Sequence, residues 1–340
     1  MNLKHQKRLF GALALPMMIV SGVLKADLPN VVTDIAPVHS LLSLVMKGIG
    51  EPKLLIPQNA SPHHYAMRPS EAKALQEANL VVYLGQDLTP WLEPLLETVA
   101  ASAEPLDLSE VGGVLQLSYR EGPVFAEQEG HDHEKEGHDD HDDHEGNDHE
   151  KEGHDDHEGR DDDAHHDHDG IDPHMWLDPT NALVWLDAIA SELGHIDPKN
   201  AARYRANAKT AKEEISHEIR HIEDHLKPVQ GERFLVFHDA YQYFENRFGM
   251  LATGSISLSD ASKPSAKRLQ QLKHYFEEEG IRCVLSEPQY SSELIDSVFG
   301  GFKPHIGVVD PIGVDLELGS GLYLQLLENV ALGIAQCVNH

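Results

Sequence analysis

The feature that most constrains the fold is an internal stretch, residues 127–170, that contains almost no apolar side chains. From Glu129 it reads EGHDHEKEGHDDHDDHEGNDHEKEGHDDHEGRDDDAHHDHDG, and HEKEGHDDH occurs in it twice, at residues 133–141 and 149–157. Such a segment cannot bury enough surface to offset the entropy lost on ordering. We therefore expect a disordered loop that interrupts the folded chain.

Histidine decides how this stretch is interpreted. An acidic run alone is usually a solvated segment, but imidazole is a common metal donor, and interleaved carboxylates concentrate cations. We therefore predict weak auxiliary metal sites on its eleven histidines: His131, His133, His138, His141, His144, His149, His154, His157, His165, His166 and His168.

The N-terminus predicts export. Lys4, Lys7 and Arg8 precede an apolar run, residues 9–24, that is too short for a good membrane span. This pattern is typical of a secretory signal peptide, residues 1–26. Since no later stretch is apolar enough to cross a membrane, we expect a soluble protein of the periplasm. The net charge of −30 excludes nucleic acid as a partner and favours cations.

Two cysteines, Cys283 and Cys337, are present. In an oxidising compartment two thiols favour one disulfide, which would close a loop of about 50 residues and stabilise the fold by about 4 kcal/mol. Two buried free thiols are the alternative. The expected export favours the disulfide.

Strand patterns alternate with helical patterns on both sides of the histidine-rich stretch, which indicates an α/β fold with parallel sheets. We expect strands at residues 30–34, 53–56, 80–84, 106–108, 234–237, 251–256, 283–285 and 306–309. We expect helices at residues 38–46, 70–77, 91–101, 178–194, 240–248, 265–279, 291–299 and 321–337.

One further helix, residues 199–226, is longer than an ordinary globular helix and follows Asp197-Pro198, which we expect to start it. We interpret it as a strut between two α/β lobes. The predicted organisation is a signal peptide at residues 1–26, an N-terminal metal-binding lobe at 27–196 with its loop at 127–170, a linking helix at 197–228 and a C-terminal metal-binding lobe at 229–340.

Potential metal ligands follow several predicted strands. His63 and His64 lie after the second strand, and His174 lies just past the loop. His238 and Asp310 follow strands of the C-terminal half. Ligands of open α/β sheets bind beyond the carboxyl ends of the strands, so these side chains could meet in one cleft. Any one of them alone is more simply a loop or core residue, but three nitrogens and a carboxylate together suit Zn²⁺.

Four motifs, PHHYAMRPS, DPHMWLDP, FHDAYQYF and DPIG, occur in this order along the chain. They resemble those of the metal-specific solute-binding proteins of ABC transporters, most closely the zinc-specific periplasmic type (ZnuA type, cluster A-I or TroA-like). The resemblance implies two Rossmann-like lobes with four-stranded parallel sheets, joined by one long rigid helix, with metal held between them. It implies His63, His174, His238 and Asp310 as the ligands, and it selects His63 over His64.

The resemblance also implies a function. Such a protein captures Zn²⁺ with high affinity and delivers it to an inner-membrane ABC permease and its ATPase; it is not an enzyme, and we expect a monomer. An accessory periplasmic zinc chaperone is a further candidate partner. Relatives that bind manganese or iron commonly carry Glu at the position of His238, so this residue favours zinc, whereas Pro62 stands where some zinc members have Glu.

Three alternatives stay open at this point. The first is a zinc hydrolase, for which Glu287 is the one carboxylate suggestively placed after a strand. The second is a periplasmic zinc buffer or chaperone that works without a transporter. The third is a manganese- or iron-specific solute-binding protein.

Overall fold

The computed structural model describes residues 28–120, 122–125, 170–257, 264–289, 292–299 and 301–339. The predicted signal peptide and the eleven histidines of the predicted loop lie outside these ranges. Within them, no helix combines the length and the apolar character needed to span a bilayer.

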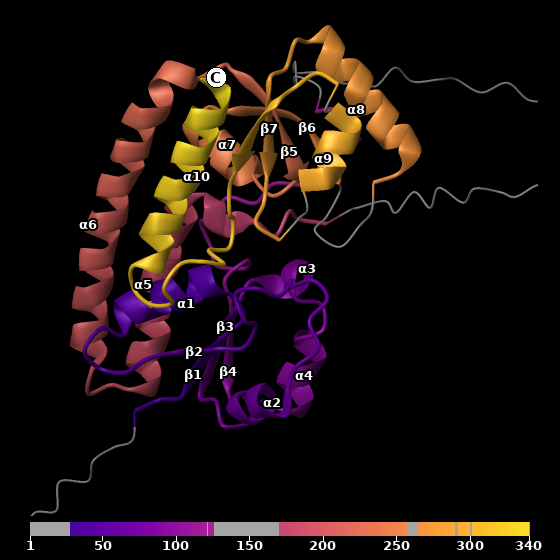
Figure 1. Ribbon diagram of the computed structural model, residues 1–340. Helices are drawn as coiled ribbons and strands as arrows, with labels where there is room; N and C mark the ends of the chain where they lie inside the picture. Colours follow the sequence, from indigo (N-terminus) through magenta and orange to yellow (C-terminus); the bar gives the residue numbers. More distant parts are fainter. Residues whose placement is uncertain are drawn as a thin grey trace, which may run out of the picture.

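The described residues form two four-stranded parallel sheets (Figure 1). The first has the order β2-β1-β3-β4 and consists of β1 (Val31–Thr33), β2 (Lys53–Leu54), β3 (Leu80–Tyr83) and β4 (Glu104–Asp107). The second has the order β6-β5-β7-β8 and consists of β5 (Arg233–His238), β6 (Leu251–Ser257), β7 (Cys283–Ser286) and β8 (His305–Val308). The predicted α/β fold with two such sheets is confirmed.

Helices follow the strands in both halves. The first half contains α1 (Ala36–Val45), α2 (Pro69–Gln76), α3 (Gly85–Leu88), α4 (Glu93–Thr98) and the 3₁₀ turn η1 (Met175–Leu177). After these come α5 (Pro179–Ile196), α6 (Ala201–Leu226), the 3₁₀ turn η2 (Lys227–Val229), α7 (Gln242–Phe248), α8 (Ala266–Glu278), α9 (Ser292–Phe299) and α10 (Leu322–Val338). The prediction omitted α3 and made α4 five residues too long.

Of the two helix starts predicted at Asp-Pro pairs, one is confirmed and the other is wrong. Asp178 caps α5 as predicted, because its side chain accepts a hydrogen bond from the Thr180 N–H at 2.9 Å. Asp197-Pro198 does not start the next helix, which begins at Ala201. The reason is that Asp197 already ends α5, where its backbone N–H bonds the Leu193 carbonyl.

The long helix α6 has 26 residues and runs beside both sheets (Figure 1). It packs on α5 and α1 from the first half and on α10 from the second. One apolar core continues from the first sheet through α5, α6 and α10 to the second sheet, and a smaller core lies under α8 and α9. The predicted domain boundaries remain predictions.

The predicted disulfide between Cys283 and Cys337 is present, with Cα atoms 5.4 Å apart. It joins β7 to the end of α10, the last helix of the chain. The bond therefore anchors the C-terminal helix to the second sheet.

The segment that leads toward residue 126 crosses from the first half to the second. Val124 pairs antiparallel with Gly254 of β6, and the Phe125 N–H donates to the Thr253 carbonyl at 2.9 Å. On the returning side, Ile171 pairs antiparallel with Ser118. Both chain ends that flank residues 126–169 are therefore held by backbone hydrogen bonds.

Candidate metal centre

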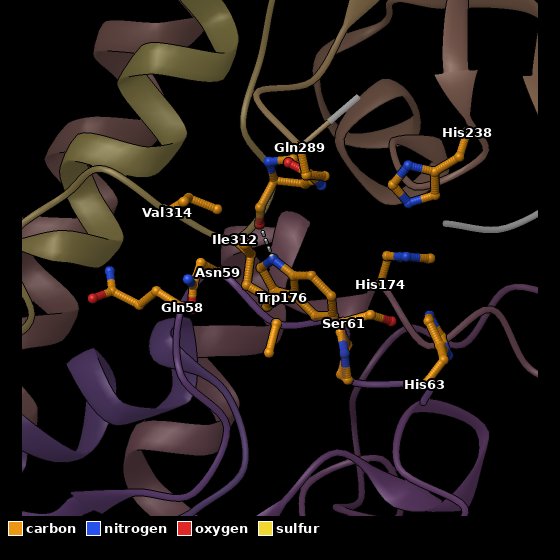
Figure 2. Close-up of a pocket in the computed structure, with 13 residues that line it drawn as sticks. Gln58, Asn59, Ser61, His63, His174, Trp176, His238, Gln289, Ile312 and Val314 are labelled. Carbon is orange, nitrogen blue, oxygen red and sulfur yellow. Dashed lines mark hydrogen bonds between the residues drawn. The ribbon is translucent and has the colours of Figure 1, made fainter. Parts of the chain in front are cut away.

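Three of the predicted ligands converge from three separate segments. His63 lies in the connection between β2 and α2, His174 directly precedes η1, and His238 is the last residue of β5. The ring centroids lie 6.1 Å apart for His63 and His174, and 5.3 Å apart for His174 and His238 (Figure 2). The rule that ligands gather beyond the carboxyl ends of parallel strands therefore brings these imidazoles together.

A buried carboxylate orients His174. Its Nδ1 lies 2.7 Å from Oδ1 of Asp172, which also accepts the His174 backbone N–H at 3.0 Å. A carboxylate accepts, so Nδ1 carries the proton and the lone pair of the ring is on Nε2. Burial raises the pKa of Asp172 to about 7, against the lowering effects of the His174 N–H and of nearby Arg120.

A second buried carboxylate orients His238. Oε1 of Glu287 accepts a hydrogen bond from Nδ1 of His238, and Oε2 accepts one from Nε2 of Gln289 at 2.8 Å. Glu287 is only 2% exposed. Metal-binding histidines typically donate their second ring nitrogen to such a carboxylate, which fixes the tautomer and the ring orientation.

The three imidazoles line one cavity (Figure 2). Trp176 forms a wall of it and is held by a hydrogen bond from its Nε1 to the Pro311 carbonyl at 2.6 Å. The complete lining is Gln58, Asn59, Ala60, Ser61, Pro62, His63, His174, Trp176, His238, Gln289, Pro311, Ile312 and Val314. No carboxylate is among these residues, so the donors offered to a cation are mainly imidazole nitrogens.

The spacing of the rings suits a tetrahedral ion. Zinc–nitrogen bonds of about 2.0–2.1 Å place the centres of two coordinated imidazoles roughly 5 Å apart. The separation of His174 and His238 already matches this value, whereas His63 is about 1 Å too far from His174. Among the described residues, no three His, Cys, Asp or Glu side chains are arranged closely enough to hold one metal ion.

Comparison with known proteins identifies the family. A family profile described as "Zinc-uptake complex component A periplasmic" (ZnuA) matches residues 31–337. The chain belongs to the ZnuA family. The high-affinity zinc uptake system protein ZnuA of Brucella suis biovar 1 is 39% identical over 338 residues, covering 99% of this chain and 100% of the relative. The same-named protein of Paracoccus denitrificans is 39% identical over 315 residues, covering 92% and 93%.

Solved structures share the fold of this ZnuA-family chain. A crystal structure of ZnuA superposes with a TM-score of 0.69 at 23% identity and covers 92% of this chain and 99% of that one. The solute-binding protein FpvC of Pseudomonas aeruginosa, solved in complex with Mn²⁺, gives a TM-score of 0.72 at 17% identity, covering 92% and 99%. At these identities the likeness concerns the fold alone.

Asp310, the fourth predicted ligand, is placed differently from the histidines. Its Oδ1 accepts the N–H groups of Ile312 and Gly313 at 3.0 and 2.8 Å, and its Oδ2 accepts the N–H of Val314 at 2.5 Å. The side chain holds its own turn and does not line the cavity. His64, the neighbour of His63, is exposed and also lies outside the lining.

Two residues orient cavity histidines of this ZnuA-family chain, and the sequence predicted neither of them in this role. Asp172 was not singled out, although its place two residues before His174 in an Asp-Pro-His sequence was a usable signal. Glu287 was noted only as a candidate base for a hydrolase, whereas it binds Nδ1 of His238. Ser61, which lines the cavity, was also not singled out, and its Oγ is buried without a hydrogen-bond partner among the described residues.

An ion-pair cluster lies behind His238. Arg120 donates to both oxygens of Asp239 and bonds Glu245 at 2.8 and 2.9 Å. Its guanidinium also stacks 3.7 Å above the ring centroid of Phe125. Because Asp239 is the next residue after His238, the cluster links the segment that approaches residue 126 to the end of β5.

Proposed function

We propose that this chain is the periplasmic zinc-binding component of an ABC transporter for zinc uptake. The observation that carries the proposal is the convergence of His63, His174 and His238 on one cavity between the two sheets. Family membership supports the same function. In this role the cavity captures Zn²⁺ with high affinity, and the protein delivers it to an inner-membrane permease that works with an ATPase.

The proposed ligand atoms are the Nε2 atoms of the three histidines. Imidazole nitrogen suits zinc well, whereas manganese prefers carboxylate oxygen and non-haem iron commonly binds two histidines together with one carboxylate. A cavity lined by three imidazoles and no carboxylate therefore favours zinc over a manganese- or iron-specific role.

We retain Asp310 as the proposed fourth ligand. An ionised carboxylate offers about four lone-pair positions, and three of these accept backbone N–H groups, so one remains for a cation. Reaching the ion requires the Asp310 turn to move toward the histidines when the cleft closes. A water molecule bonded to Ser61 Oγ would take the fourth position if the turn stays in place.

Binding rather than catalysis fits the carboxylates around the cavity. A zinc hydrolase needs a general base beside an open coordination position. Glu287 was the candidate for that base, and both of its oxygens already bond His238 and Gln289. The protein is thus proposed to carry zinc without transforming a substrate.

The remaining assignments follow from this role. The protein is proposed to be an exported, soluble monomer, with the histidines of residues 127–170 as weak auxiliary sites and an accessory zinc chaperone as a further candidate partner. A buffer that works without a transporter is the less favoured reading, since it needs only weak sites and gives no reason for a cavity with two carboxylate-oriented histidines.

A zinc titration of the mature protein against a competing chelator tests the proposal. One ion should bind tightly, and His63→Ala, His174→Ala and His238→Ala should each abolish that tight binding. His64→Ala is the matched control, because it removes an adjacent imidazole that lies outside the cavity. Equal losses in His63→Ala and His64→Ala would contradict the assigned ligand, and weak binding alone in the unmodified protein would contradict the transport role.

A further inference from the structure

A second group of histidines lies on α6 and takes no part in the cavity. The sequence HEIRHIEDH, residues 217–225, repeats histidine every four residues. Since an α-helix has 3.6 residues per turn, His217, His221 and His225 follow one another along one face. The rings of His221 and His225 are in direct contact, with centroids 4.4 Å apart in an edge-to-face arrangement.

Hydrogen bonds orient both of these rings in the same sense. Nδ1 of His225 lies 3.0 Å from the backbone carbonyl oxygen of His221. Nδ1 of His221 lies 3.4 Å from Oε1 of Glu218. Because a carbonyl and a carboxylate can only accept, each Nδ1 is the protonated nitrogen and each Nε2 carries the lone pair. Metal-binding histidines use the same arrangement to present Nε2 to an ion.

The surroundings of the pair favour a cation. His221 is 41% exposed at its side chain, and His225 is exposed, so an ion reaches both from solvent. Glu218 contributes a carboxylate beside His221, and the pair lies in the last two turns of α6, where the negative end of the helix dipole attracts positive charge. The apolar side of this part of the helix, Ile222 and Leu226, is buried against the core.

We propose that His221 and His225 form a second zinc site on the outer face of α6. The two Nε2 atoms bind one ion, and water occupies the remaining positions. Two imidazoles provide fewer protein ligands than the three of the cavity, so this site is the weaker of the two. It shares no residue with the cavity and does not depend on the proposed transport function.

Site-resolved histidine modification tests this site in the full chain. Diethylpyrocarbonate reacts with imidazole nitrogen, and peptide mass spectrometry reports each histidine separately while zinc chloride is titrated. His221 and His225 should lose reactivity together over one zinc range. His221→Ala should raise the zinc concentration that half-protects His225 by roughly 100-fold, because chelation by two linked donors exceeds binding by one by about that factor.

His274→Ala on α8 is the matched control. His274 is an exposed imidazole whose Nε2 lies 3.2 Å from Glu278 one turn away, so it has a carboxylate neighbour, and the residues four positions away on either side, Gln270 and Glu278, are not histidine. Its removal should leave the protection of His221 and His225 unchanged. His63→Ala should also leave that protection unchanged while removing tight binding, which separates this site from the cavity. Protection of His225 that is independent of His221, or no protection beyond that of His274, would overturn the proposal.

Discussion

At the scale of single residues, two buried carboxylates contact the cavity histidines, and we expect the zinc affinity of the cavity to depend on these contacts. We expect Glu287→Gln to weaken tight zinc binding by about 10–100-fold, the usual cost of losing such an orienting partner. The amide keeps the size of the side chain but removes its negative charge from Nδ1 of His238. Chelator competition measures the affinity, and the melting temperature of the zinc-free protein serves as a folding control. Unchanged affinity in Glu287→Gln would show that the contact does not position the ring.

Asp34 predicts a pH dependence of stability. It is fully buried after β1, where it accepts the N–H groups of Ile35 and Leu84 at 2.7 and 2.9 Å. Burial raises the pKa of Asp34 to about 6 from 3.8. Between these values the folded state binds the proton and the unfolded state does not. The contribution of Asp34 to the free energy of unfolding is therefore fully present below pH 3.8 and is lost as the pH rises through 6.

Urea unfolding of the zinc-free Asp34→Asn variant and the parent from pH 4 to 7 measures this contribution. The stability of the parent relative to the variant should fall across this range by up to about 3 kcal/mol. Asp187→Asn, which changes an exposed carboxylate, should show no such difference in slope. Parallel pH profiles for Asp34→Asn and the parent would mean that the carboxyl group titrates alike in the folded and unfolded states.

The sequence located the proposed ligand histidines better than the groups that support them. His63 and His238 follow strands of the two sheets, and the motifs around them and around His174 resemble those of metal-binding relatives. The partner of His238, Glu287, lies 49 residues along the chain, directly after the neighbouring strand β7. Such a pairing depends on strand order, which local patterns do not contain. For Asp310, the motif identified the residue, but it did not indicate whether the carboxylate faces the cavity or its own turn.

At the scale of elements, α10 packs so closely on β8 that a glycine is required between them. A Cβ atom on Gly333 would lie 2.6 Å from Val309 Cγ1 and 3.0 Å from the Val308 carbonyl oxygen. Gly333→Ala should therefore lower the free energy of unfolding by about 1–3 kcal/mol through overpacking. At an exposed helical site the same change would stabilise by up to about 1 kcal/mol.

Denaturant unfolding distinguishes these two cases. Gly112→Ala is the control, because a Cβ atom there meets no other atom within 4 Å. The control should have little effect on stability. A stabilised Gly333→Ala protein would show that α10 can move away from β8 at little cost, despite the disulfide at its end.

The elements themselves were largely predictable, because buried strands and amphipathic helices have distinct periodicities. The short helix α3 was missed because four residues carry no periodic signal, and Gly85 opens it with a φ of 73°. The continuity of the core was also missed. Tyr323 of α10 donates to the Trp176 carbonyl at 2.7 Å and so ties the last helix to a segment 147 residues earlier.

At the scale of the whole molecule, the histidine-rich stretch and the cavity should behave as separable metal-binding parts. The sequence predicts disorder for this stretch, so its histidines would gather around an ion only if several residues became ordered, at roughly 1–2 kcal/mol of backbone entropy per residue. The cavity histidines are already held by a strand end, by η1 and by buried carboxylates. The stretch should therefore bind several zinc ions weakly and the cavity one ion tightly.

Deletion of residues 129–169 should remove the weak sites and preserve the tight one. We expect the fold to tolerate the cut, because both flanking segments keep their own bonds, from the Phe125 N–H to the Thr253 carbonyl at 2.9 Å and from the Asp172 N–H to the Leu117 carbonyl at 2.8 Å. Titration of the intact and deleted proteins with Zn²⁺ in a competing chelator measures both classes of site. Loss of the tight site on deletion would mean that the stretch itself supplies ligands to the bound ion. Preservation of that site, with fewer ions bound at high zinc, would leave the stretch the role of collecting zinc near a cavity that holds the ion unaided.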